Sequence, residues 1–207
     1  MSFQTPCHAL DQRRLAVQEH QSLAVLTGRD FRQHSVANAL ATIAAAEHVG
    51  VAIETACAAL SNFGGVKRRM ELLGTIRGIE VYDDFAHHPT AIETTLDGAR
   101  KRLGERKLWA IIEPRSNTMR MGSHKEGLAD SARLADAVIW YQPEGLDWDL
   151  QPVVAAARNH AVVANTLDEI IQNIVSQAGE GDAVVIMSNG GFGGLHQKLI
   201  QALQHTA

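Results

Sequence analysis

One segment of the chain places two carboxylates and two imidazoles between an apolar run and a proline. It reads Val81-Tyr82-Asp83-Asp84-Phe85-Ala86-His87-His88-Pro89-Thr90. The apolar start predicts a strand, and Pro89 suits the first turn of a helix, where its missing N–H loses nothing. Polar residues at the carboxyl end of a strand, just before a helix, are where α/β folds place ligand sites. Asp83 and Asp84 can hold ribose hydroxyls, a metal ion or a cationic group, or they can cap the helix.

Adjacent histidines make a metal site a poor explanation of this segment. His87 and His88 cannot share one helix face as metal-binding histidines four residues apart do. We expect them to cap the helix or to hydrogen-bond a substrate, and we expect no metal ligands in the chain.

Two further polar clusters follow predicted strands. They are Glu113-Pro114-Arg115-Ser116-Asn117-Thr118 and Ser188-Asn189-Gly190-Gly191-Phe192-Gly193-Gly194. A guanidinium such as that of Arg115 can grip a carboxylate or phosphate with two parallel bonds, and its position at a strand end favours this over a solvated loop arginine. The glycine run opens a helix, where free N–H groups attract anions, or it serves only a tight turn. Because the carboxyl ends of parallel strands form one crevice, we predict a single ligand site from the three clusters.

Several familiar catalytic patterns are missing from the sequence. Neither a Walker A loop nor a G-x-G-x-x-G fingerprint occurs. Ser188 does not lie in a G-x-S-x-G turn, so a hydrolase triad with His196 and Asp182 is not favoured. The cationic run at Lys67–Arg69 could neutralise a transferring phosphoryl group, or it could be a solvated charge run.

The regular alternation of elements after the first cluster predicts the fold class. Expected strands span 69–74, 79–83, 108–113, 137–142, 161–164 and 183–188, and expected helices span 90–103, 125–134, 152–159, 167–178 and 195–203. The later strands are continuously apolar, which is typical of strands buried on both faces of a parallel sheet. We therefore predict an α/β domain with a Rossmann-like, mostly parallel sheet and helices on both faces.

The region before this domain is expected to be helical. An Ala-rich helix over 36–49 with Ser35 as its N-cap and a second helix over 53–61 are predicted, with a possible short helix at Leu10–Gln18. The first 25 or so residues are otherwise unclear. The Gly64-Gly65 pair suggests a boundary, giving residues 1–64 and 65–207 as two domains.

Composition limits the class of protein. The 207 residues are 45% hydrophobic and 20% charged, with a net charge of −4, so nothing points to nucleic acid as a partner. The two cysteines, Cys7 and Cys57, lie in no metal-binding spacing, and Cys57 is expected to be a small core residue. With no signal peptide and no apolar run of roughly 18 residues, we expect no membrane partner and a cytoplasmic location.

Taken together, the clusters resemble signatures of the Mur ligases, the ATP-dependent enzymes that build peptidoglycan precursors. The similar motifs are the 82–90 segment, the 113–119 segment ending in Met119, and the 187–194 segment that starts at Met187. The resemblance runs from about Gly28 to the end of the chain. It implies that residues from about 66 onward are the family's Rossmann-like C-terminal domain, and that the earlier part is the tail of the central ATPase domain.

The resemblance also implies an activity, with ATP and Mg²⁺ as cofactors. The motifs are most similar to the family branch that joins the recycled murein tripeptide L-alanyl-γ-D-glutamyl-meso-diaminopimelate to UDP-N-acetylmuramate through an acyl phosphate. The branch that adds L-alanine has a similar aspartate–histidine motif but differs in the other two, so it is the alternative.

Roles carry over by position from the family. Asn38 matches an asparagine that contacts the nucleotide base. Arg69 matches an arginine that reaches the ATP phosphates, and Asp84 matches an aspartate at the ribose. The resemblance therefore makes Arg69 and Asp84 the candidate catalytic residues. The expected substrate-binding residues are His87, His88, Arg115, Ser116, Asn117, Ser188 and Asn189. We expect Arg115 to hold a carboxylate of the tripeptide.

The departures from the family pattern bear on what this chain can do alone. Relatives have His-Asn where this chain has His34-Ser35, and the phosphate loop, the metal-binding glutamate and the modified lysine of the central domain are absent, as is the UDP-binding domain. Mg²⁺ would thus be bound mainly outside this sequence, and we expect a fragment that binds peptide without ligating it. A stand-alone binding module for murein peptides or nucleotides, or an unrelated Rossmann-type oxidoreductase, are the alternatives.

Overall fold

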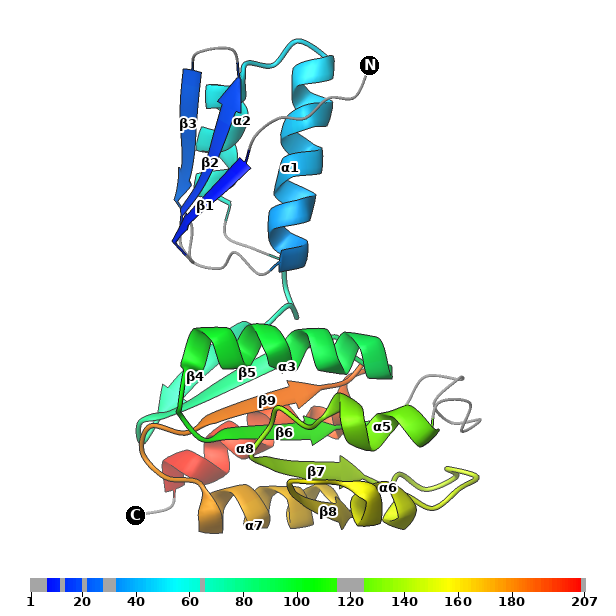
Figure 1. Ribbon diagram of the computed structural model, residues 1–207. Helices are drawn as coiled ribbons and strands as arrows, with labels where there is room; N and C mark the ends of the chain where they lie inside the picture. The colour runs from blue at the N-terminus through cyan, green and yellow to red at the C-terminus, as the bar shows by residue number, and fades with distance from the viewer. Residues whose placement is uncertain are drawn as a thin grey trace. The chain divides into compact units, whose positions relative to one another are not determined.

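The computed structural model describes residues 7–11, 14–19, 22–27, 33–63, 66–114 and 125–205. The chain divides into two compact units, Met1–Gly65 and Val66–Ala207. Figure 1 shows both units. Among the described residues, none of the helices is both long and apolar enough to span a membrane.

Unit 1 contains an antiparallel sheet that the sequence did not predict. Strands β1 (Cys7–Asp11), β2 (Arg14–Glu19) and β3 (Ser22–Thr27) pair in that order. The helix expected at Leu10–Gln18 is therefore wrong, and the segment before the Rossmann-like domain is not purely helical. A short apolar run in the sequence does not show whether the segment forms a strand or a helix. In unit 1, pairing between neighbouring segments makes them strands.

Two helices complete unit 1. They are α1 (Gln33–His48) and α2 (Ile53–Ser61), so Ser35 lies inside α1 and is not its N-cap. Cys57 is buried in a small cluster with Ile43 and Ile53, as expected for a core cysteine. Burial, and then the nearby charge of Glu54, raise the pKa of the Cys57 thiol.

Unit 2 is built on a six-stranded sheet that confirms the predicted fold class. Its strands are β4 (Glu71–Ile76), β5 (Ile79–Asp84), β6 (Leu108–Ile112), β7 (Ala137–Tyr141), β8 (His160–Ala164) and β9 (Ala183–Met187). Their order in the sheet is β4-β5-β9-β6-β7-β8. Strands β5 to β9 are mutually parallel, and β4 pairs antiparallel with β5 at one edge.

Helices cover both faces of this sheet (Figure 1). The helices are α3 (Pro89–Leu103), α5 (Lys125–Ser131), α6 (Gln151–Ala156), α7 (Leu167–Gln177) and α8 (Leu195–His205). Buried residues of α3, α5 and α6 share one hydrophobic core, and those of α7 and α8 share the other. In α3 the core residues Ile92, Leu96 and Ala99 recur at helical spacing, which presents one apolar stripe to the sheet.

The order of the strands predicts a ligand crevice at their carboxyl ends. Strand β9 lies between β5 and β6, and it leads through the short η1 turn (Phe192–Gly194) into α8 on one face. Strands β5 and β6 lead to α3 and α5 on the opposite face. Connections that diverge from neighbouring parallel strands leave an opening between them, where α/β proteins bind ligands.

Candidate functional site

The three polar clusters begin at neighbouring strand ends. Asp84 at the end of β5 is in register with Met187 of β9, which is in register with Ile112 of β6. Glu113 and Ser188 therefore follow adjacent positions at the same edge of the sheet. The structure brings these segments together as the strand pattern predicts, and the site is built from their side chains.

The two aspartates of β5 serve opposite faces of the sheet. Successive side chains of a strand alternate between faces, so adjacent carboxylates must point apart. Asp83 meets His196 of α8, whereas Asp84 meets Thr95 of α3. The pair therefore does not act as one dicarboxylate, as a shared metal or cation site would require.

Asp84 is a buried anchor for the chain that precedes β4. Its carboxylate accepts hydrogen bonds from the backbone N–H of Met70 at 2.8 Å and of Ala86 at 2.9 Å, and from Thr95 Oγ1 at 3.0 Å. The side chain is 0% exposed. Hydrogen bonds to a charged group are among the strong ones in proteins, so Asp84 fixes the backbone directly after Arg69 and directly after Phe85.

The turn that holds Arg69 is strained and pinned at several points. Arg68 and Met70 have φ values of +58° and +50°, in the left-handed region of backbone conformation that residues other than glycine rarely adopt. The N–H of Arg68 donates to Glu71 Oε2 at 2.8 Å, and the carbonyl of Arg68 accepts from the N–H of Phe85 at 2.9 Å. Strain of this kind persists only where surrounding contacts enforce it, and it is found preferentially at functional sites.

This turn presents the Arg69 guanidinium at the surface. The Arg69 side chain is exposed and its guanidinium carbon lies 5.9 Å from the centre of the Phe85 ring, while that of Arg68 lies 5.2 Å from the same ring. A cation over an aromatic face is held in place by that contact. Anion binding by Arg69 stays a prediction from the sequence.

Arg68, which the sequence did not single out from its cationic neighbours, ties three segments together. Its Nε donates to Asp83 Oδ2 at 3.0 Å and its Nη2 donates to the carbonyl oxygen of Ser188 at 2.6 Å. His196 Nε2 lies 3.1 Å from the other Asp83 oxygen. Burial raises the pKa of Asp83, but the hydrogen bonds and charges of His196 and Arg68 outweigh it, so the pKa lies below its ordinary value.

The lowered pKa of Asp83 predicts a pH-dependent contribution to stability. A carboxyl whose pKa is lower in the folded state stabilises the fold above its unfolded pKa, near 3.8, and this is lost as the pH falls through the folded pKa. We expect Asp83→Asn to be less stable than the native chain at pH 6, with a smaller difference at pH 3. Urea unfolding at both pH values measures this, and an equal difference at both would contradict it.

Ser188 is buried and hydrogen-bonded within unit 2, and its expected contact with a substrate stays a prediction. It is 0% exposed, and its Oγ donates to Glu113 Oε2 at 2.5 Å and accepts from the N–H of Gly190 at 2.9 Å. The excluded hydrolase triad does not form, since His196 pairs with Asp83 and Asp182 accepts from Trp109 Nε1. The next residue, Asn189, is half-buried, and its Oδ1 is enclosed without a hydrogen-bond partner.

The histidines shape the start of α3. His87 Nδ1 lies 2.8 Å from the carbonyl oxygen of Phe85, and the His87 ring meets the rings of Phe85 and His88 edge-on. His88 occupies the N-cap position in an extended conformation, but its side chain makes no capping hydrogen bond. Within the described part of the chain, no three His, Cys, Asp or Glu residues are grouped so that they could hold a metal ion.

The remaining predicted residues lie elsewhere. Asn38 is exposed on α1 of unit 1, and its carbonyl oxygen accepts a hydrogen bond from Thr42 Oγ1 at 2.8 Å. Arg115, Ser116 and Asn117 lie outside the described residues. Their proposed contacts with ligands remain predictions from the sequence.

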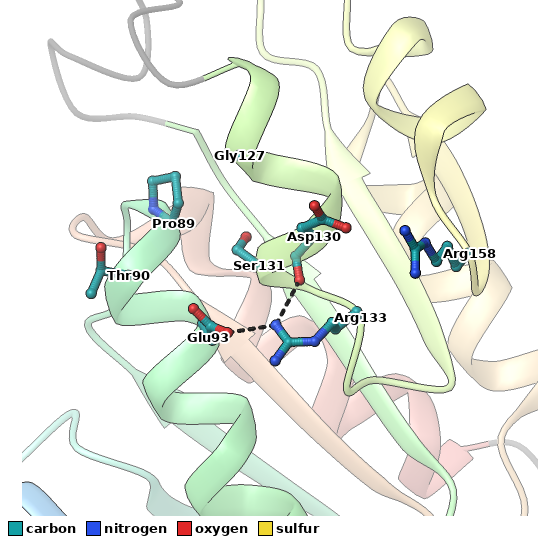
Figure 2. A pocket seen from close by; sticks show the side chains of 8 residues that line it. All are labelled: Pro89, Thr90, Glu93, Gly127, Asp130, Ser131, Arg133 and Arg158. Atoms are coloured by element: carbon teal, nitrogen blue, oxygen red, sulfur yellow. Dashed lines mark hydrogen bonds and ion pairs between the residues drawn. The ribbon is translucent and has the colours of Figure 1, made fainter.

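An open pocket of about 530 Å³ lies between α3 and α5 (Figure 2). It is lined by Pro89, Thr90, Glu93, Gly127, Asp130, Ser131, Arg133 and Arg158. Arg133 spans it, since its Nη1 donates to Glu93 Oε1 at 2.5 Å and to the carbonyl oxygen of Asp130 at 3.4 Å. The hydrogen bond and charge of Glu93 raise the pKa of Arg133. Because Arg133 is neutralised in this way and none of the predicted ligand residues lines the pocket, the crevice is the better candidate.

Comparison with known proteins identifies the family of the chain. The family model "Mur ligase, glutamate ligase domain" matches residues 68–190, a range that starts at Arg68 and ends just after Ser188. A curated relative, the UDP-N-acetylmuramate–L-alanyl-γ-D-glutamyl-meso-2,6-diaminoheptandioate ligase of Haemophilus influenzae, is 44% identical over 94% of this chain and 43% of its own length. A match of that extent must include part of the first 21 residues, so the similarity begins before Gly28, where the motifs placed its start.

Two further relatives show the same relationship. The crystal structure of a murein peptide ligase from Psychrobacter arcticus is 50% identical, with a TM-score of 0.74, and the match covers 97% of this chain and 44% of that one. A UDP-N-acetylmuramate–L-alanine ligase of Paenarthrobacter aurescens is 32% identical over 83% of this chain and 38% of its own length. The chain thus spans about two fifths of the length of the relatives it matches. By sequence and fold, this chain is a member of the Mur ligase family.

Proposed function

We propose that the chain supplies the peptide-binding part of an ATP-dependent ligase that joins L-alanyl-γ-D-glutamyl-meso-diaminopimelate to UDP-N-acetylmuramate. The observation that carries this proposal is the pinned, strained turn that presents Arg69 beside a crevice formed by the ends of β5, β9 and β6. The name and 44% identity of the Haemophilus influenzae relative support the choice of substrates.

In this proposal Arg69 is a catalytic residue and Asp84 a positioning residue. Arg69 is exposed and fits an anionic phosphate group, whereas both Asp84 oxygens are occupied inside unit 2. ATP, with its Mg²⁺, would supply the phosphoryl group that activates the muramoyl carboxylate. Arg69 would neutralise charge at the phosphates.

The crevice would hold the attacking peptide in reach of the activated carboxylate. Holding two reactants in a productive geometry is itself a large part of catalysis in amide ligases. The Arg68–Asp83–His196 ties keep the Ser188 segment fixed to the turn of Arg69, so the peptide and phosphate sides of the crevice keep their spacing.

A chimera tests the proposal directly. Residues 33–207 replace the matching segment of the Haemophilus influenzae relative, and ADP release is measured with UDP-N-acetylmuramate and either the tripeptide or L-alanine. We expect turnover with the tripeptide. Turnover with L-alanine alone would favour the alternative branch, and binding of peptide without turnover in a folded chimera would favour a non-catalytic module.

Arg115→Ala should weaken binding of the tripeptide to the chain by at least about tenfold, because a bidentate carboxylate bond is lost. Isothermal titration calorimetry measures the affinity. Arg133→Ala is the matched control, since Arg133 lies in the separate pocket and is already neutralised by Glu93, and its affinity should stay within about twofold of native. An unchanged affinity in Arg115→Ala would refute the assignment.

A further inference from the structure

Phe85 is a large aromatic residue at the joint between β5 and α3. Its backbone is fixed, because its N–H donates to the carbonyl oxygen of Arg68 at 2.9 Å and its own carbonyl oxygen lies 2.8 Å from His87 Nδ1. The residue is half-buried, and in the described part of unit 2 it belongs to neither hydrophobic core. Phe85 therefore has a fixed place at the strand end without a share in the packing of the sheet.

Two arginines and a histidine lie against the Phe85 ring. The guanidinium carbons of Arg68 and Arg69 are 5.2 Å and 5.9 Å from the ring centre. Both distances are within the roughly 6 Å over which a cation is attracted to an aromatic face. The His87 ring meets the Phe85 ring edge-on, with 5.4 Å between the ring centres.

The two arginines on this ring are held in different ways. The Arg68 guanidinium is fixed independently of the ring, since it donates to Asp83 Oδ2 at 3.0 Å and to the carbonyl oxygen of Ser188 at 2.6 Å. Arg69 is exposed. A long arginine side chain has several rotatable bonds, so stacking on a fixed ring restricts the orientations that its planar fork can take. The ring thus connects a fixed guanidinium to an exposed one.

We propose that Phe85 is a positioning residue for ligation, and that its ring holds the Arg69 guanidinium in the orientation in which it meets the phosphate groups. This inference rests on the proposed function and deepens it, because it names a residue through which Arg69 acts. A group that stabilises developing charge is most effective when it is oriented before the reaction. Loss of the ring should therefore lower kcat more than it raises KM for the peptide.

A fluorinated series at position 85 tests this role in the chimera that contains residues 33–207. Mono-, di- and trifluorinated phenylalanine keep the shape of the Phe85 ring almost unchanged and weaken the negative potential of its face stepwise. We expect kcat for tripeptide-dependent ADP release to fall with each added fluorine. Phe85→Leu should lower kcat by about tenfold with KM within about twofold, whereas Phe85→Tyr keeps the aromatic face and should stay within about twofold of the native rate.

Two further measurements separate positioning from a role in folding. In an Arg69→Ala background, Phe85→Leu should cause no further loss of kcat, because the ring acts through Arg69. An equal loss in both backgrounds would overturn the proposal. In the 207-residue chain, the NMR order parameter of the Arg69 Nε–H group should fall in Phe85→Leu and keep its native value in Phe85→Tyr. Equal order parameters in all three proteins would also overturn it.

The possible failures are distinguishable. A native kcat in Phe85→Leu and in the whole fluorinated series, with a large loss in Arg69→Ala, would overturn the role of Phe85 and leave the proposed function standing. A folded chimera without tripeptide-dependent ADP release would overturn both. If circular dichroism shows that Phe85→Leu is unfolded, the fluorinated series decides, because its side chains keep the native shape.

Discussion

Replacing Asp84 with alanine should lower the free energy of unfolding of unit 2 by about 3 kcal/mol, the largest stability change that we expect from a single polar substitution. The variant leaves the N–H groups of Met70 and Ala86 and the hydroxyl of Thr95 without their acceptor in a buried place. Hydrogen bonds to a charged group contribute about 1.5–3 kcal/mol each, and their losses are not additive. Urea unfolding followed by circular dichroism gives the difference, and a melting temperature lower by roughly 10 °C should accompany it.

Two matched variants show whether the anchor, and not charge removal in general, is responsible. Thr95→Val removes one of the three donors and should cost about 1 kcal/mol. Asp97→Ala removes a carboxylate from the exposed side of α3, where it pairs with Lys101, and should cost less than about 0.5 kcal/mol. A loss below about 1 kcal/mol in Asp84→Ala would show that Asp84 is not an anchor, and would reopen direct contact with a ligand.

The sheet of unit 2 could be predicted because its signal is local. Continuously apolar runs such as Trp109–Ile112 and Ala183–Met187 permit little besides a strand that is covered on both faces, and both are buried in the structure. The strands of unit 1 carry no such signal. Segments such as Arg14–Glu19 are short and mixed, and their state depends on pairing with β1 and β3, which no local pattern shows.

The candidate site was predictable as a place but not as a set of contacts. Strand ends followed by helices indicated where the crevice should lie. Side chains alternate between the two faces of a sheet along a strand, so the sequence of β5 alone could have shown that Asp83 and Asp84 point to opposite faces. The partner of Asp83 could not be found in this way, because His196 lies 113 residues further along the chain. It reaches Asp83 only because β9 inserts beside β5 and sends α8 to the same face.

Arg69 should be the residue of this chain whose loss most reduces ligation. In the chimera described above, Arg69→Ala should lower the rate of tripeptide-dependent ADP release by at least about 100-fold, a typical consequence of removing one preorganised group that stabilises developing charge. The strained turn supports this expectation, because Arg68 and Met70 on either side of Arg69 keep left-handed conformations, and such strain is found preferentially at functional sites. Arg69→Lys should recover only part of the rate, since the charge remains but the planar fork is lost.

Lys67→Ala tests the competing explanation, in which the cationic segment acts only through its diffuse field. Lys67 is exposed and lies two residues before Arg69. If only the diffuse field matters, Lys67→Ala and Arg69→Ala should reduce the rate by similar factors. If the Arg69 guanidinium contacts the phosphates directly, Lys67→Ala should change the rate by less than about threefold. The salt dependence of the rate separates the two further, because Debye screening weakens a diffuse field more than a contact with phosphate. An Arg69→Ala chimera that folds and retains more than about a tenth of the native rate would remove Arg69 from the catalytic machinery.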